Sequence, residues 1–89
     1  MIEKGNESMV LERFQHYLSA ALLRNYGRIP SAAVFADDFN LRAVGTTTVT
    51  RETTRKWING ITLPTVGHIV VLVAWLDLDV NVMFGKSEK

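Results

Sequence analysis

The sequence contains no cysteine among its 89 residues. Disulfide bonds and thiolate metal sites are therefore excluded, and a reducing compartment is compatible with the chain. Repeats and low-complexity segments are also missing. The longest strongly apolar run, residues 69–76, is too short to cross a bilayer, and the first residues lack the basic and apolar regions of a signal peptide. These absences predict a soluble, cytoplasmic protein without a membrane partner.

Charge is nearly balanced over the whole chain but unevenly distributed along it. The net charge is +1 at pH 7, whereas residues 41–60 alone carry +3, from Arg42, Arg51, Arg55 and Lys56 against Glu52. Hydrophobic residues make up 47% and charged residues 21%, as in an ordinary globular domain. A local basic surface on a nearly neutral domain is typical of a small, specific DNA-binding protein.

The sequence offers no pattern that is typical of an enzyme. A cysteine nucleophile, a glycine-rich phosphate loop and metal-ligand spacing are all absent, and His16 and His68 lie far apart. Both histidines are expected at the surface. The adjacent carboxylates Asp37 and Asp38 have no histidine or third ligand nearby, so a solvated helix face is the better interpretation. We therefore expect a protein that is not an enzyme and uses no metal or cofactor.

Apolar residues at spacings of three and four predict a long first helix. Ser8 can cap its N-terminus, so that the helix begins at Met9, and Gly27 can end it. Residues 1–7 are polar and predict a flexible N-terminus, and residues 86–89 form a polar tail. The domain itself is expected to span residues 8–85.

The second helix is followed by a segment that is too long for a tight turn into the third helix. Ser31 can cap this helix, whose expected buried side is formed by Ala33, Phe35, Ala36 and Phe39. Residues 40–49 contain Gly45 and a run of threonines, which disfavour helix and favour extended backbone. We predict an extended loop or short hairpin here. Two interpretations stay open: a plain connector, or a loop whose hydroxyls, amides and Arg42 touch phosphates.

Residues 50–60 predict a short third helix with two different faces. Thr50 can cap it, and Gly60 can adopt the left-handed conformation that closes a helix. Its small apolar face contains Thr54, Trp57 and Ile58, and the opposite face contains Arg51, Glu52, Arg55, Lys56 and Asn59. Guanidinium, ammonium and amide groups on one face suit the major groove of DNA. The alternative is an ordinary solvated surface helix.

The last third of the chain predicts two further helices. Thr65, after Pro64, can cap a fourth helix that is apolar nearly all round, so we expect it to be the central core helix. The acidic segment 77–79 interrupts it, and residues 80–84 predict a short final helix ended by Gly85. The expected fold is therefore all-α, a compact domain of five helices with an extended loop between the second and third.

This order of motifs resembles the lambda-repressor-like helix-turn-helix family, which includes phage repressors, Cro-type regulators and small bacterial regulators. The resemblance covers roughly residues 9–85. It rests on Ser31 with Ala36, on Trp57-Ile58-Asn59-Gly60, and on the Leu63-Pro64-Thr65 step into an apolar helix. It implies that the third helix, about Thr50–Asn59, is the recognition helix. Two features depart from the family: the long segment 40–49, and Ala32, where a glutamine often stands.

The resemblance implies a sequence-specific transcriptional regulator that binds double-stranded DNA, of the phage or mobile-element repressor type. The resemblance implies that Arg51, Glu52, Thr53 and Arg55 are base-contact candidates, and that Asn59 matches a position that often holds a phosphate. The DNA-binding interpretation adds further phosphate-contact candidates from the residues themselves: Arg42, Thr50 and Lys56.

The partners that follow from this interpretation are DNA and a second copy of the chain. A homodimer on two half-sites is expected, because one small domain makes few contacts. Its candidate surfaces are Met83 and Phe84 of the last helix, or exposed parts of the first helix. The alternative function is a protein-binding module, such as the antitoxin of a toxin–antitoxin pair, which the long loop and the low net charge favour.

Overall fold

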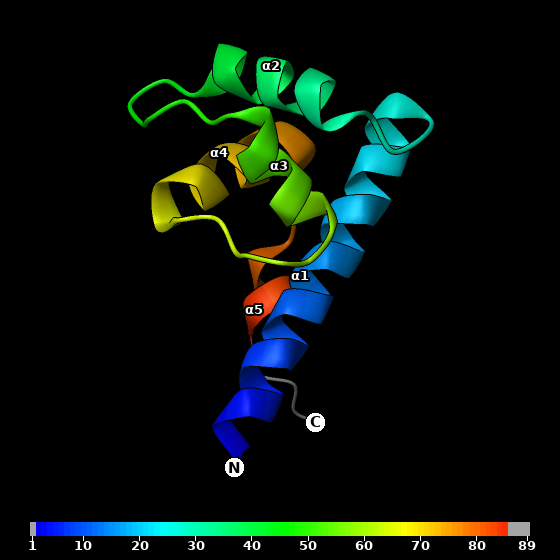
Figure 1. Ribbon diagram of the computed structural model, residues 1–89, viewed down its shortest axis with the longest axis vertical. Coiled ribbons are helices and arrows are strands. Elements are labelled where there is room, and N and C mark those ends of the chain that lie inside the picture. The colour runs from blue at the N-terminus through cyan, green and yellow to red at the C-terminus, as the bar shows by residue number, and fades with distance from the viewer. Residues whose placement is uncertain (1, 86–89) are drawn as a thin grey trace.

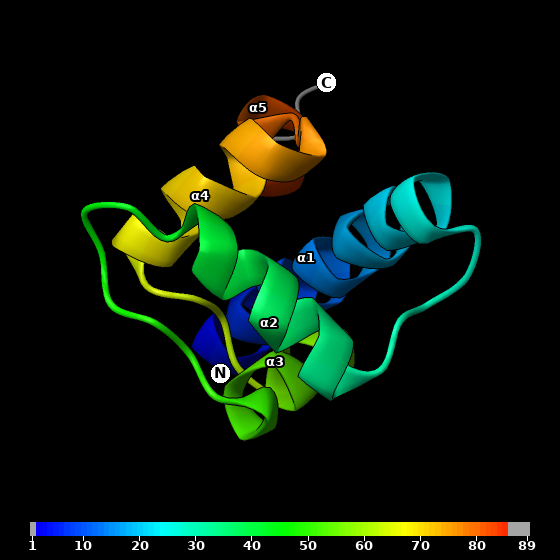
Figure 2. The same ribbon diagram turned by 90° about the horizontal axis from the view of Figure 1, so that it is seen from above.

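The computed structural model describes residues 2–85, with side chains from Met9 onward, and these residues form helices joined by loops (Figure 1). The helices are α1 (Ile2–Tyr26), α2 (Ala32–Arg42), α3 (Arg51–Ile58), α4 (Val66–Leu76) and α5 (Val80–Phe84). No strand occurs within residues 2–85, so the predicted all-α class is confirmed. Seen from above, α2 crosses over α3 and over α1, α4 lies to the left of α2, and the C-terminal part of α1 emerges to its right (Figure 2).

Helix α1 begins earlier than predicted. Its first residue is Ile2 rather than Met9, so Ser8 lies inside the helix and does not cap its N-terminus. Residues 2–7, expected to be flexible, belong to the helix. Glu3, Lys4 and Glu7 are good helix formers, whereas Gly5 and Asn6 are poor ones. The extension is feasible because elongating an existing helix needs no new nucleation. The other end agrees with the prediction, because the helix stops before Gly27, which has a φ of +78°.

The four shorter helices begin at capping side chains. Ser31, Thr50 and Thr65 accept hydrogen bonds from the backbone amides of Val34, Thr53 and His68, as their positions predict. Asp79 caps α5 in the same way by accepting from the amides of Asn81 and Val82, a role that the sequence analysis missed.

Aromatic side chains fill the core between α2, α3 and α4. The ring of Phe39 lies 5.4 Å from that of Trp57 and 5.4 Å from that of His68, and Phe35 lies 6.1 Å from Trp57. The prediction of a surface His68 is therefore wrong: it is only 8% exposed, because the face of α4 that carries it packs inward. The prediction of a buried Ala33 is also wrong, because this residue is exposed. The buried residues of α2 are Phe35, Ala36 and Phe39.

The C-terminal helix α5 packs against α1. Phe84 stacks on Phe14 with ring centroids 6.4 Å apart, and Met83 is 1% exposed. Arg13 of α1 also donates a hydrogen bond of 3.1 Å to the carbonyl of Gly85. Met83 is thus a core residue, and the expectation that it forms a dimer surface is wrong.

The two adjacent carboxylates of α2 have different surroundings. Asp37 is exposed, as predicted, but Asp38 is half-buried and accepts a hydrogen bond from the Tyr26 hydroxyl at the end of α1. Burial and this hydrogen bond raise the pKa of Tyr26 above its usual range. Asp38 therefore ties α2 to α1 rather than lying on a solvated face.

Helix α4 is not the fully buried helix that its composition predicts. His68, Val71, Leu72 and Leu76 are buried, but Val66 is 80% and Val70 62% exposed. The helix lies at the edge of the bundle, where α1 and α2 pack on one side of it. Within residues 2–85, no helix is both long enough and apolar enough to pass through a membrane.

Candidate nucleic-acid interface

The buried face of α3 locks this helix onto α2. Trp57 is 1% exposed and packs edge-on against the rings of both Phe35 and Phe39. Thr54 is fully buried, and its hydroxyl donates to the carbonyl of Ala32 at 2.8 Å and to that of Arg51 at 3.1 Å. One hydroxyl hydrogen is shared between the two carbonyls. The start of α2 therefore holds the middle of α3, and the prediction that Thr54 and Trp57 are core residues is confirmed.

The C-terminal end of α3 is held by α1. The side-chain amide of Gln15 donates to the carbonyl of Ile58 at 3.1 Å. Gly60 follows with a φ of +69°, and a Cβ at this position would lie 3.3 Å from Cγ of Gln15. Both the backbone conformation and the close approach of Gln15 therefore favour glycine.

The loop between α2 and α3 is closed at its base by Asn40. The Asn40 side chain donates to the carbonyl of Val49 at 2.9 Å and accepts from the Val49 amide at 2.8 Å. This pairing imitates that of a neighbouring strand, and it fixes the backbone just before the cap Thr50. The segment is an extended loop as predicted, but it is shorter than 40–49, because α2 continues to Arg42, and the predicted alternative of a hairpin is not formed.

The tip of this loop is anchored on α4. Nε2 of His68 lies 3.0 Å from both the hydroxyl and the carbonyl oxygen of Thr47. Since a carbonyl can only accept, Nε2 carries a hydrogen. Gly67 allows the approach, because a Cβ there would come within 2.9 Å of the Thr46 hydroxyl oxygen.

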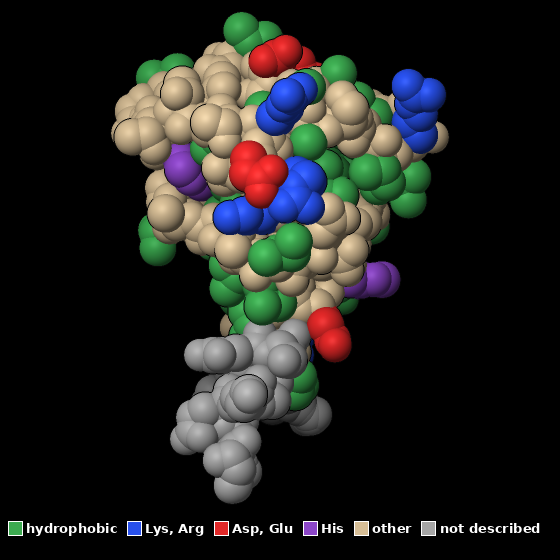
Figure 3. Space-filling model, in the orientation of Figure 1, with side chains coloured by type: hydrophobic (Ala, Val, Ile, Leu, Met, Phe, Trp, Pro, Cys, Tyr) green, Lys and Arg blue, Asp and Glu red, His purple; other side chains and the backbone are tan. Residues whose placement is uncertain are grey.

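Seven of the eight predicted contact residues lie on α3 or at its two caps. Thr50, Arg51, Glu52, Arg55 and Asn59 are exposed, and Thr53 and Lys56 are half-buried. Figure 3 shows cationic and anionic side chains gathered near the middle of the face on which α3 lies in Figure 1. The outward side of α3, which we call its front, is therefore charged and carries Arg51, Glu52, Arg55, Lys56 and Asn59. The opposite side is buried and fixed against α2.

Glu52 and Arg55 form a bidentate ion pair on this front. Nε of Arg55 donates to Oε1 of Glu52 at 2.9 Å and Nη2 donates to Oε2 at 2.7 Å. These hydrogen bonds hold the pKa of Glu52 below its ordinary value and raise that of Arg55. An exposed pair contributes little to stability. Its effect here is to orient the guanidinium, whose Nη1 takes no part in the pair.

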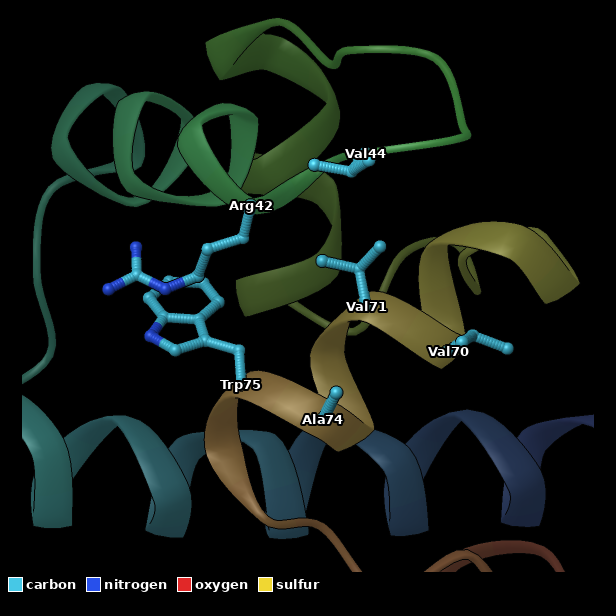
Figure 4. Close-up of a pocket in the computed structure, with 6 residues that line it drawn as sticks. All are labelled: Arg42, Val44, Val70, Val71, Ala74 and Trp75. Atoms are coloured by element: carbon cyan, nitrogen blue, oxygen red, sulfur yellow. The ribbon is translucent and has the colours of Figure 1, made fainter.

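Arg42 does not lie with the other predicted contact residues. Its Nη1 donates to the carbonyl of Asp38 at 2.7 Å, and its guanidinium carbon lies 4.5 Å from the ring centroid of Trp75 on α4. Figure 4 shows the side chain reaching from the end of α2 to Trp75. A phosphate contact from Arg42 would require the guanidinium to leave this aromatic ring.

Sequence reasoning missed the residues that position α3 from a distance. Gln15, Asn40 and His68 each bond to a backbone group or a hydroxyl that is remote in the sequence. The spacing of residues predicts partners one helical turn away, and it contains no signal for these pairings.

No family model, curated protein or solved structure matches the chain. The lambda-repressor-like resemblance therefore stays a prediction. Among the residues with described side chains, no group of histidine and carboxylate side chains is arranged to hold a metal ion. The geometry of α3 is the feature from which a function can be argued.

Proposed function

We propose that this protein is a sequence-specific transcriptional regulator that binds double-stranded DNA through α3. The observation that supports it is the contrast between the two faces of this helix. Trp57 and Thr54 fix the back against α2, while Arg51, Glu52 and Arg55 are exposed at the front. In this proposal α2 and α3 act as a helix-turn-helix of the lambda-repressor type, with an enlarged turn.

The dimensions of α3 suit the major groove. An α-helix with side chains is about 10–12 Å across, and the groove of B-DNA is roughly 12 Å wide. Arg51 is the first residue of α3, and recognition helices contact bases with their N-terminal residues. In the proposed complex Arg51 donates both guanidinium hydrogen bonds to a guanine, and Thr53 lies next to it.

Glu52 and Arg55 read bases as a pair in this proposal. Glu52 accepts from the amino group of a cytosine, and Arg55 donates to a neighbouring guanine through its remaining hydrogens. Their mutual hydrogen bonds set both side chains before DNA arrives, so less conformational entropy is lost on binding. Thr50, Lys56 and Asn59 hold phosphates on either side of the groove.

The test is selection of binding sites from a random duplex library, repeated at two salt concentrations. We expect one enriched motif, and a salt dependence that reflects a few phosphate contacts. The control is Arg24→Ala, which removes an exposed arginine at the end of α1 and should leave the motif unchanged. Salt-sensitive binding without an enriched motif, or no binding at all, would contradict sequence-specific recognition.

A protein-binding module, such as the antitoxin of a toxin pair, is the second candidate function. The observation that favours it is the exposed apolar face of α4, where Val66 and Val70 lie open to solvent. A partner that co-purifies with wild type but not with a Val70→Lys variant, together with a failed DNA selection, would favour this candidate over the first.

A further inference from the structure

The outward face of α4 is an uncharged apolar surface. It consists of Val66, Ile69, Val70, Val73 and Ala74, and Val80 at the start of α5 adjoins it. A helix that is hydrophobic all round is normally buried all round. Here only one side is buried, so the α4 face leaves apolar surface that a partner would cover at a gain in free energy.

The ridges and hollows of this face have the spacing that two packed helices need. Val66, Val70 and Ala74 form one row at a spacing of four, and Ile69 and Val73 form the neighbouring row. A hollow of about 460 Å³ lies over these two rows, and a second of about 420 Å³ lies between Val70, Ala74 and Arg42. Figure 4 shows Val71 directed toward Val44 and Val70 directed away from Arg42 and Trp75. Val70 and Ala74 border both hollows and form a ridge between them.

We infer that the α4 face binds the α4 face of a second copy of this chain, so that the protein is a two-fold symmetric dimer. In a two-fold interface the same patch meets itself and must be self-complementary. A ridge flanked by hollows meets this condition, because the Val70–Ala74 ridge of each copy can enter a hollow of the other. Rows at a spacing of four that interdigitate in this way cross at about −50°.

The distribution of charge favours a second copy over a charged partner. The sequence contains no Asp, Glu, Lys or Arg between Lys56 and Asp77, a stretch that includes the whole of α4. The charged residues near this helix, Arg42, Asp77 and Asp79, lie toward its C-terminal end. A two-fold axis that passes near Val70 and is perpendicular to α4 makes the two helices antiparallel, with that end of each helix toward the uncharged N-terminal end of the other. No like charges are brought together in this arrangement.

The size of the face predicts a weak dimer. The eleven residues of α4 form a strip about 16 Å long and roughly 10 Å wide. With Val80 beside it, this surface is smaller than the roughly 800 Å² that each partner buries in a standard interface. We therefore expect a weak, reversible dimer rather than a permanent one.

The absence of native cysteine makes disulfide trapping a clean test of this face. Val70→Cys places one thiol on the ridge, and two such thiols facing each other across the axis come within the Cα separation that a disulfide needs. The control is Leu23→Cys on α1, where Leu23 is 51% exposed and lies outside the α4 face. We expect Val70→Cys to give a covalent dimer under mild oxidation much faster than Leu23→Cys. Equal rates for the two variants would overturn the proposal.

Sedimentation without DNA provides the second measurement. Wild type and Leu23→Lys should show a concentration-dependent dimer, and Val70→Lys should remain a monomer with unchanged helical circular dichroism, because Val70 is 62% exposed. The proposed dimer would be overturned if wild type stays monomeric at millimolar concentration, or if Val70→Lys dimerises like wild type.

Only the consequence for DNA rests on the proposed function. If the dimer and the DNA-binding proposal both hold, the selected motif is a palindrome, and Val70→Lys binds a single half-site as well as wild type does. Dimerisation is measured without DNA, so the two proposals can fail separately. If the selected site is a palindrome and Val70→Lys binds it as tightly as wild type does, dimerisation through the α4 face is contradicted.

Discussion

At the scale of single residues, Glu52 decides how the front of α3 is charged. Its carboxylate would repel phosphates, but it also orients Arg55 through two hydrogen bonds. Removing the charge while keeping the shape therefore changes affinity and specificity in opposite directions. The variant Glu52→Gln separates the two effects.

We predict that Glu52→Gln binds DNA more tightly overall but discriminates less at the base pair that Glu52 and Arg55 read. The loss of discrimination should be about 1–3 kcal/mol, the usual difference for one well-made base contact. Competition between the selected duplex and single-position variants measures it. An unchanged preference at every position would contradict the proposed role of the pair.

The same pair predicts a pH dependence with a definite sign. The pKa of Glu52 in the folded protein is lowered from its ordinary value of 4.5 by its hydrogen bonds to Arg55. The pair therefore contributes fully above the unfolded pKa, and the contribution is lost as the pH falls from there through the folded pKa. The slope of stability with pH in this acid range should be smaller in Glu52→Gln than in wild type. The difference is small because the pair is exposed to solvent.

At the scale of elements, the position of α3 depends on the loop before it. Asn40 closes that loop through both of its side-chain bonds to Val49, and Val49 is only 9% exposed. The cap Thr50 follows immediately, so the direction in which α3 starts is tied to the end of α2.

Asn40→Ala should destabilise the domain by about 1–3 kcal/mol, since two hydrogen bonds to partly buried backbone groups are lost. It should also weaken DNA binding by more than this stability loss explains, because α3 is no longer held in one orientation. Urea denaturation and binding at low temperature measure the two effects. The matched control is Thr48→Ala, an exposed residue of the same loop, which should change neither. Wild-type affinity in a folded Asn40→Ala protein would contradict this account of the loop.

The helices differ in how much of them could be predicted, and the reason is the range of the interactions. Caps such as Ser31 and Thr65 bond to amides a few residues away, so sequence patterns find them. His68 could not be placed, because α4 is apolar on every side and periodicity does not say which side faces inward. Helical spacing places five of the contact candidates on one face, namely Arg51, Glu52, Arg55, Lys56 and Asn59. Thr50 is the N-cap and Thr53 is half-buried, so these two do not share that face. Arg42 is different, since its position depends on Trp75 in another element.

At the scale of the whole molecule, one small domain carries two separate surfaces. The charged front of α3 is proposed for DNA and the α4 face for a second copy, and the core around Trp57 and Phe39 holds both helices in place. Each surface is on a rigid helix, so two-fold pairing through α4 would fix the distance between two α3 helices. The distance between half-sites in the DNA would then be set by the protein.

The most direct measurement of the central claim is a binding cycle with a modified base. The guanine assigned to Arg51 in the selected duplex is replaced by 7-deazaguanine, which lacks only the major-groove N7 acceptor. Wild type should lose affinity on this replacement, by a part of the about 1–3 kcal/mol that a bidentate guanine contact contributes, because the hydrogen bond to O6 remains. Arg51→Ala should lose nothing further, because the partner of N7 is already missing. Equal losses in both proteins, or no loss in either, would contradict an α3 that reads the major groove through Arg51.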